Sequence, residues 1–107
     1  MPASALMDKS LEEIIIALCA DFERRRAAIE EKALPKRVLL EYKFLNLRIL
    51  EGTIEIVGIS NARRFIDEIG TRRGYAKSSI EDMSETSYKK LKARAKLSIA
   101  QKLSLTK

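Results

Sequence analysis

The side chains of this sequence that are best suited to chemistry are cations and hydroxyl groups near its C-terminus. Residues 88–107 contain seven Lys or Arg and no Asp or Glu, and Thr86 and Ser87 precede them. Ammonium and guanidinium groups bind phosphate oxygens, and Lys, Ser and Thr side chains also bind base edges. These residue types indicate recognition of a nucleic acid. A solvated Lys-rich helix without a partner is the alternative.

The charge of the chain is unevenly distributed. Residues 1–59 carry nine basic and ten acidic side chains, a net charge of −1, whereas residues 60–107 carry twelve and five, a net charge of +7. Positive charge gathered on one terminal segment is typical of proteins that bind nucleic acid. Residues 60–107 are therefore the candidate binding region.

Groups suited to catalysis or metal binding are scarce. The sequence has no His, which excludes imidazole catalysis and His-containing metal sites. Its single Cys, Cys19, lies in an apolar run and is predicted to be buried. The carboxylates of residues 12–31 are predicted to form a solvated helix face, and Arg24, Arg25 and Arg26 to pair with neighbouring Glu residues. We expect no enzyme activity, no metal site, no cofactor and no small-molecule substrate.

The composition favours a small all-α protein. The chain has 107 residues, of which 46% are hydrophobic, and it contains only four Gly and two Pro, as is typical of a compact helical domain. No apolar run approaches the roughly 18–20 residues needed to span a bilayer, and the first residues lack the pattern of a signal peptide. We therefore expect a cytoplasmic protein that does not contact membranes.

Apolar residues recur at helical spacing in two long segments. After a flexible leader at residues 1–7, a first helix is predicted over residues 11–32. Leu34-Pro35 interrupts the pattern, and a second helix is predicted over residues 35–57. Because the link between them is short, residues 8–59 are predicted to form a long antiparallel hairpin.

The second helix carries two apolar stripes, although a helix with a single partner shows only one. The first helix can cover one stripe, which comprises Val38, Tyr42, Leu45, Ile49 and Ile56. The other stripe is predicted to bind a second copy of the chain, so that the hairpin forms a homodimer. The alternative is that the C-terminal helices fold back over it. The predicted interface residues are Leu40, Phe44, Leu47, Leu50 and Ile54.

Residues 60–107 are predicted to form a helix-turn-helix-like unit of three helices, over residues 62–71, 77–83 and 85–103. Ser84 caps the last helix and Tyr88 faces its core contact. The polar residues at the start of this helix are expected to read duplex DNA, and its later cations to bind phosphates. The predicted DNA-binding residues are Thr86, Ser87, Lys89, Lys90, Lys92, Arg94 and Lys96, with Arg72, Arg73 and Lys77 near the preceding helix.

A short motif in this region resembles the helix-turn-helix core of sigma-factor region 4: Ile80-Glu81-Asp82-Met83-Ser84-Glu85-Thr86-Ser87-Tyr88-Lys89-Lys90. Residues 75–104 look more similar still to the C-terminal part of phage late-gene activators of the ArpU/RinA type. In that family a Ser opens the recognition helix, a Tyr or Val anchors it, and basic residues follow. The resemblance implies DNA-binding transcriptional control.

Three functional hypotheses follow from the sequence. The first is a dimeric, DNA-binding transcriptional regulator of phage or mobile-element type. The second is a helical adaptor that binds other proteins and whose basic tail only adds solubility. The third is an oligomeric phage structural or packaging component that contacts DNA without reading its sequence.

Overall fold

The computed structural model describes residues 7–80 and 82–106, and every regular element within them is helical. In chain order these are α1 (Lys9–Ala20), α2 (Phe22–Glu31), α3 (Lys36–Val57), α4 (Ile59–Thr71), the 3-10 turn η2 (Tyr75–Lys77) and α5 (Glu85–Lys102). The prediction of an all-α protein is confirmed. No helix in the described residues is long and apolar enough to cross a membrane.

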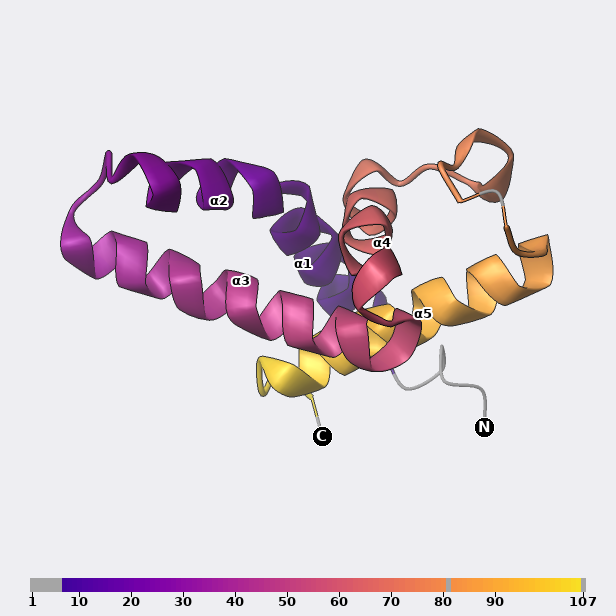
Figure 1. Ribbon diagram of the computed structural model, residues 1–107. Coiled ribbons are helices and arrows are strands. Elements are labelled where there is room, and N and C mark those ends of the chain that lie inside the picture. The colour runs from indigo at the N-terminus through magenta and orange to yellow at the C-terminus, as the bar shows by residue number, and fades with distance from the viewer. Residues whose placement is uncertain (1–6, 81, 107) are drawn as a thin grey trace.

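The predicted first helix, over residues 11–32, is broken in two at Asp21. At the break the guanidinium of Arg25 donates a hydrogen bond to the backbone carbonyl of Leu18. This contact lets α2 turn away from α1 and lie along α3. α2 and the N-terminal half of α3 form an arm on one side of the molecule (Figure 1). The prediction of one continuous helix is therefore wrong. Of the predicted leader, residues 1–6 lie outside the described residues, and Met7 packs against the core.

The start and end of α3 agree with the helix predicted over residues 35–57. Pro35 occupies the N-cap position, and the left-handed conformation of Lys32, with φ 54°, reverses the chain after α2. Gly58, with φ 83°, separates α3 from α4 by a single residue. A positive φ suits Gly best because Gly has no Cβ. α4 begins three residues earlier than the helix predicted over residues 62–71.

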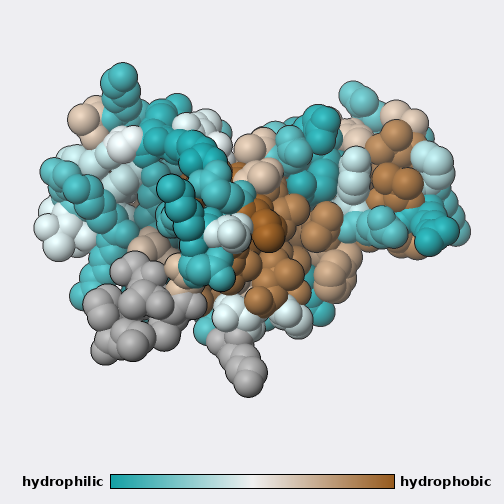
Figure 2. All heavy atoms as spheres, turned by 180° about the vertical axis from the view of Figure 1, so that it is seen from behind, coloured by the Kyte–Doolittle hydropathy of each residue, from teal (hydrophilic) through white to brown (hydrophobic). Residues whose placement is uncertain are grey.

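The core lies where α4 and α5 pack against α3 on one side and against α1 on another. Gly52 and Gly70 allow the closest approaches: a Cβ on Gly52 would lie 2.9 Å from the backbone of Ile99, and one on Gly70 would lie 2.7 Å from that of Ala20. In the view from behind, apolar side chains gather in the middle of the molecule (Figure 2). The buried residues of the core include Ile15, Cys19, Phe22, Ile49, Ile66, Ile69, Ala95 and Ile99.

The core therefore combines residues from both predicted ranges, 8–59 and 60–107. α4 and α5 both pack against α3. The C-terminal helices thus fold back over α3, as the alternative interpretation of the sequence proposed, but they leave the outer side of its N-terminal half exposed. The predicted burial of Cys19 is confirmed, since only 3% of the residue is exposed, and burial raises the pKa of its thiol to about 12.

The prediction of a short helix over residues 77–83 is wrong for the described residues of that range. They form the end of η2 and irregular chain, and Glu81 lies outside the described residues. Two serines occupy the backbone groups that a helix would use. The Ser78 hydroxyl bonds both the carbonyl and the amide of Ile80, and the Ser79 amide donates to the Glu68 carboxylate. Ser side chains that bond nearby backbone compete with helix formation in this way.

Candidate nucleic-acid interface

α5 begins at the predicted capping residue. The Ser84 hydroxyl accepts a hydrogen bond of 3.2 Å from the Ser87 amide, and the helix runs from Glu85 to Lys102. Tyr88, only 1% exposed, anchors the first turns, with its ring 6.0 Å from that of Phe65 and 5.5 Å from that of Tyr75. The assignment of Tyr88 to the core is confirmed. The side of α5 opposite this ring faces solvent.

Four of the predicted DNA-binding residues share that solvent side, which we call the outward face of α5. Thr86, Ser87, Lys90 and Arg94 are all exposed, and their spacings of three and four residues place them together on one side of the helix. Lys90 and Arg94 form no ion pair with any residue that the structure describes. The Ser87 hydroxyl accepts a hydrogen bond of 3.1 Å from the Ser84 hydroxyl and can still donate one. These four side chains are therefore able to bind an external ligand.

Two further cations of α5 are engaged within the chain. Lys92 Nζ donates to the Arg73 carbonyl at 2.7 Å and to the Tyr88 hydroxyl at 3.2 Å, and burial lowers the pKa of Lys92. Lys96 Nζ forms an ion pair of 2.8 Å with Glu12 of α1, and the Lys96 side chain is 16% exposed. Their amines join α5 to the loop and to α1, so neither is free to bind a phosphate without breaking an internal contact.

The predicted cations next to α4 are also partnered. Arg72 donates through both terminal nitrogens to Glu13 of α1, with a distance of 3.0 Å from Nη1. These hydrogen bonds lower the pKa of Glu13 and raise that of Arg72. The Arg73 guanidinium pairs with Asp67 and, at 3.0 Å, with Glu68. Both arginines therefore help to hold the end of α4 in place.

The last two predicted cations are exposed. Lys89 Nζ forms a surface ion pair of 2.8 Å with Glu85, one turn earlier in α5. Such exposed pairs contribute little energy, so the Lys89 ammonium can exchange partners at small cost. Lys77, at the end of η2, forms no ion pair with a described residue. The set of available groups thus comprises the outward face of α5 with Lys77 and, at small cost, Lys89.

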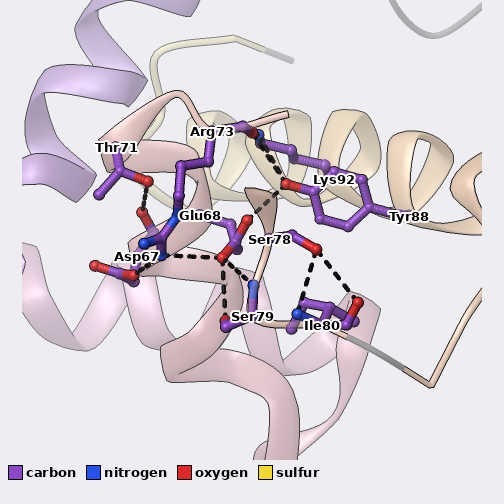
Figure 3. Close-up of polar contacts among 9 residues, drawn as sticks. All are labelled: Asp67, Glu68, Thr71, Arg73, Ser78, Ser79, Ile80, Tyr88 and Lys92. Carbon is purple, nitrogen blue, oxygen red and sulfur yellow. Dashed lines mark hydrogen bonds and ion pairs between the residues drawn. The ribbon is translucent and has the colours of Figure 1, made fainter. Parts of the chain in front are cut away.

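A buried carboxylate that the sequence analysis did not single out holds the loop against α5. Glu68 of α4 is fully buried, and its Oε2 accepts hydrogen bonds of 3.0 Å from the Ser79 amide, the Ser79 hydroxyl and Arg73 (Figure 3). Its Oε1 accepts a bond of 2.7 Å from the Tyr88 hydroxyl. We call these four residues the Glu68 cluster. It connects α4, the loop that carries Lys77, and the first turns of α5.

The Glu68 cluster favours the ionised carboxylate. Burial alone would raise the pKa of Glu68, but the hydrogen bonds from Ser79 and Tyr88 and the charge of Arg73 outweigh it, so the pKa is lowered. Burial, together with the hydrogen bond to Glu68, raises the pKa of Tyr88. The sequence does carry a signal for this site, because Glu68 is three residues after Phe65 and lies on the apolar face of its helix.

A second buried charge lies between α2 and α3. Arg25, only 4% exposed, donates from Nε to the side-chain oxygen of Asn46 at 2.7 Å, and Asn46 donates to the Phe22 carbonyl at 3.1 Å. We call Arg25, Asn46 and the Leu18 and Phe22 carbonyls the Arg25 cluster. The predicted pairing of Arg25 with neighbouring Glu residues is therefore wrong. The prediction holds for Arg26, which pairs with Glu23 and Glu30, whereas Arg24 pairs with Asp21.

The predicted interface residues of α3 divide into two groups. Leu40, Phe44 and Leu47 are 55%, 52% and 53% exposed and form a stripe on the outer side of the helix. Leu50 packs against the core of its own chain, and Ile54 is partly buried. The exposed stripe is an apolar surface that nothing in the described chain covers.

Comparisons with protein-family models, with curated proteins and with solved structures find no match.

Proposed function

We propose that this protein binds duplex DNA through the outward face of α5 and acts as a transcriptional regulator of phage or mobile-element type. The observation that carries the proposal is the placement of Thr86, Ser87, Lys90 and Arg94 on one solvent-exposed side of the first turns of α5, with both cations unpaired among the described residues. Hydroxyls at the start of a helix and cations one and two turns later suit a helix that enters the major groove N-terminus first.

The electrostatic properties of this end of the molecule support the proposal. The N-terminus of a helix carries partial positive charge, which favours phosphate groups near Ser84 and Thr86. Lys77 and Lys89 lie on either side in sequence of these residues and extend the set of available cations. The net charge of +7 on residues 60–107 raises the rate of encounter with a polyanion. Phosphate contacts supply affinity, and the hydroxyl groups supply any discrimination among base pairs.

The proposed regulator is a homodimer joined through the exposed stripe Leu40, Phe44 and Leu47 of α3. A two-fold dimer presents two α5 helices and therefore favours a site made of two inverted half-sites. The same stripe also favours a second candidate function, that of an adaptor that binds another protein. Binding to random duplex DNA separates the two, because an adaptor has no affinity for it. Competition between specific and random DNA separates a regulator from a structural DNA-binding component.

A matched pair of variants tests the DNA-binding proposal. Lys90→Ala/Arg94→Ala removes two cations from the outward face of α5, and Lys32→Ala/Lys36→Ala removes two exposed cations from the far end of the arm. The first variant should bind random duplex DNA at least tenfold more weakly at about 50 mM salt, with a salt slope smaller by about two. The control variant, which has the same net charge, should bind as the unmodified protein does.

Equal losses in the two variants would show that only net charge matters and would contradict an interface on α5. Thr86→Ala tests sequence reading on a selected site. It should reduce the preference for that site by roughly 1–3 kcal/mol if the hydroxyl contacts a base edge, while leaving binding to random DNA unchanged. Circular dichroism of each variant should match that of the parent, because these side chains contribute nothing to the core.

A further inference from the structure

The charged residues beside the exposed stripe of α3 form a regular pattern. Arg37, Glu41, Arg48 and Glu55 are separated by four, seven and seven residues, so they lie along one flank of the helix, next to Leu40, Phe44 and Leu47. Their signs alternate along the helix as plus, minus, plus, minus. Arg37 and Glu41 form no ion pair with a described residue.

When this pattern is read in the opposite direction, each position carries the opposite charge. In an antiparallel pair of helices related by a two-fold axis, the same flank of both helices lies side by side. If Phe44 of one copy packs against Leu47 of the other, Arg37 faces Glu55 of the second copy with an offset of one residue, about 1.5 Å along the axis. Glu41 faces Arg48 with an offset of two residues, about 3 Å. Long side chains span both offsets.

From this charge pattern we infer that the stripe of α3 binds the α3 of a second copy in antiparallel orientation, centred between Phe44 and Leu47. Each interface then contains two Arg37–Glu55 pairs and two Glu41–Arg48 pairs around an apolar centre. A parallel pair would instead place the cationic ends of both helices, with Lys36 and Arg37, next to each other. Antiparallel packing also places the positive end of each helix dipole beside the negative end of the other, which is favourable.

The contacts within one chain are compatible with this arrangement. Arg48 stacks on the Phe44 ring at 5.2 Å and pairs with Glu51 at 2.9 Å, and its side chain is 40% exposed, so its guanidinium is accessible to a second carboxylate. Glu55 pairs with Lys102 of α5 at 2.8 Å, and its side chain is 58% exposed, which leaves it accessible to a second cation. On the side of α3 that faces the viewer's lower left in Figure 1, no other helix covers the N-terminal half.

The inference rests on the self-association in the proposed function and is independent of DNA binding. The test uses two charge reversals, Arg37→Glu and Glu55→Lys, measured by sedimentation equilibrium. Each variant alone places like charges opposite each other twice per dimer and should dimerise roughly tenfold more weakly. In an equimolar mixture, Glu at position 37 faces Lys at position 55 and the unmodified pair is retained, so the heterodimer should regain the affinity of the unmodified chain.

Several controls separate the possible failures. Arg64→Glu, a reversal at an exposed α4 position away from α3, should leave dimerisation unchanged. Phe44→Lys should give monomers, because it places a charge in the apolar centre. A dimer whose two weakened variants do not recover on mixing would overturn the antiparallel register but not self-association. A monomer mass for the unmodified chain at all concentrations would overturn both, while duplex-DNA binding by that monomer would leave the role of α5 intact.

Discussion

Two buried charged residues, Glu68 and Arg25, have different kinds of partners. Glu68 lies in the part of the molecule that positions the candidate interface, and Arg25 lies in the part that shapes the arm. Glu68 has a cationic partner, Arg73, and accepts three more hydrogen bonds from Ser79 and Tyr88. Arg25 forms no ion pair with a carboxylate of the described residues; its hydrogen bonds go to the neutral side-chain oxygen of Asn46 and to a backbone carbonyl.

A charge with an opposite partner and a full set of hydrogen bonds is well stabilised, whereas a charge bonded only to neutral groups keeps much of its desolvation cost. The Glu68 cluster therefore contributes strongly to stability and holds three segments around the start of α5. The Arg25 cluster mainly satisfies polar groups at the break between α1 and α2. Replacement by an apolar residue should therefore lower the free energy of unfolding strongly at Glu68. At Arg25 it should lower it only weakly when Asn46 is replaced as well.

The largest effect is expected for Glu68→Ala. The substitution breaks the ion pair with Arg73, removes the acceptor of the partly buried Ser79 amide and leaves the Tyr88 hydroxyl with only the Arg73 carbonyl. It should lower the free energy of unfolding by about 3 kcal/mol. Urea unfolding followed by circular dichroism measures this change. The control is Asp67→Asn, which removes the exposed partner of Arg73 and should cost less than about 1 kcal/mol. Equal costs for the two variants would mean that the Glu68 cluster does not stabilise the fold.

A smaller effect is expected for Arg25→Met. The variant leaves the Leu18 carbonyl and the Asn46 side-chain oxygen without the Arg25 donors but also removes a buried charge, so the net loss should be about 1–2 kcal/mol. Adding Asn46→Leu should recover much of that loss, because apolar replacement of both partners leaves fewer unsatisfied groups. If the double variant is less stable than Arg25→Met alone, the proposed difference between the two clusters is wrong.

The smallest effect concerns pH. Because folding lowers the pKa of Glu68, its contribution is fully present above the unfolded pKa of about 4.3 and is lost as the pH falls through the lower folded value. Stability should therefore decrease below about pH 5, and Glu68→Gln should flatten that decrease. Arg25→Met should not, since burial lowers the pKa of Arg25 but an arginine remains protonated throughout this range. Urea midpoints between pH 3 and 7 measure both slopes.

Helical periodicity was sufficient to predict α3, α4 and α5, because each has apolar residues at spacings of three and four. Pro35 and Ser84 mark the starts of α3 and α5, whereas α4 begins three residues before its predicted start. It failed where side chains form hydrogen bonds with backbone groups. Arg25 breaks the first helix by bonding Leu18, and Ser78 and Ser79 prevent a helix by bonding Ile80 and Glu68. The spacing of apolar residues carries no information about these hydrogen bonds.

The candidate site shows the same limit. Spacing on α5 indicates that Thr86, Ser87, Lys90 and Arg94 share one side of the helix. It does not reveal that Lys96 pairs with Glu12, 84 residues away, or that Arg72 pairs with Glu13. These contacts depend on how α1 lies across the C-terminal helices, which periodicity within one helix does not specify.

The affinity of the full chain for random duplex DNA, measured as salt is raised from about 50 to 200 mM, shows whether the outward face of α5 binds duplex DNA. Binding should be measurable at the lower salt, and the logarithm of affinity should decrease linearly with the logarithm of salt concentration. The slope should become less negative by about two in Lys90→Ala/Arg94→Ala. Absence of binding at about 50 mM salt, where phosphate contacts are strong, would contradict the claim.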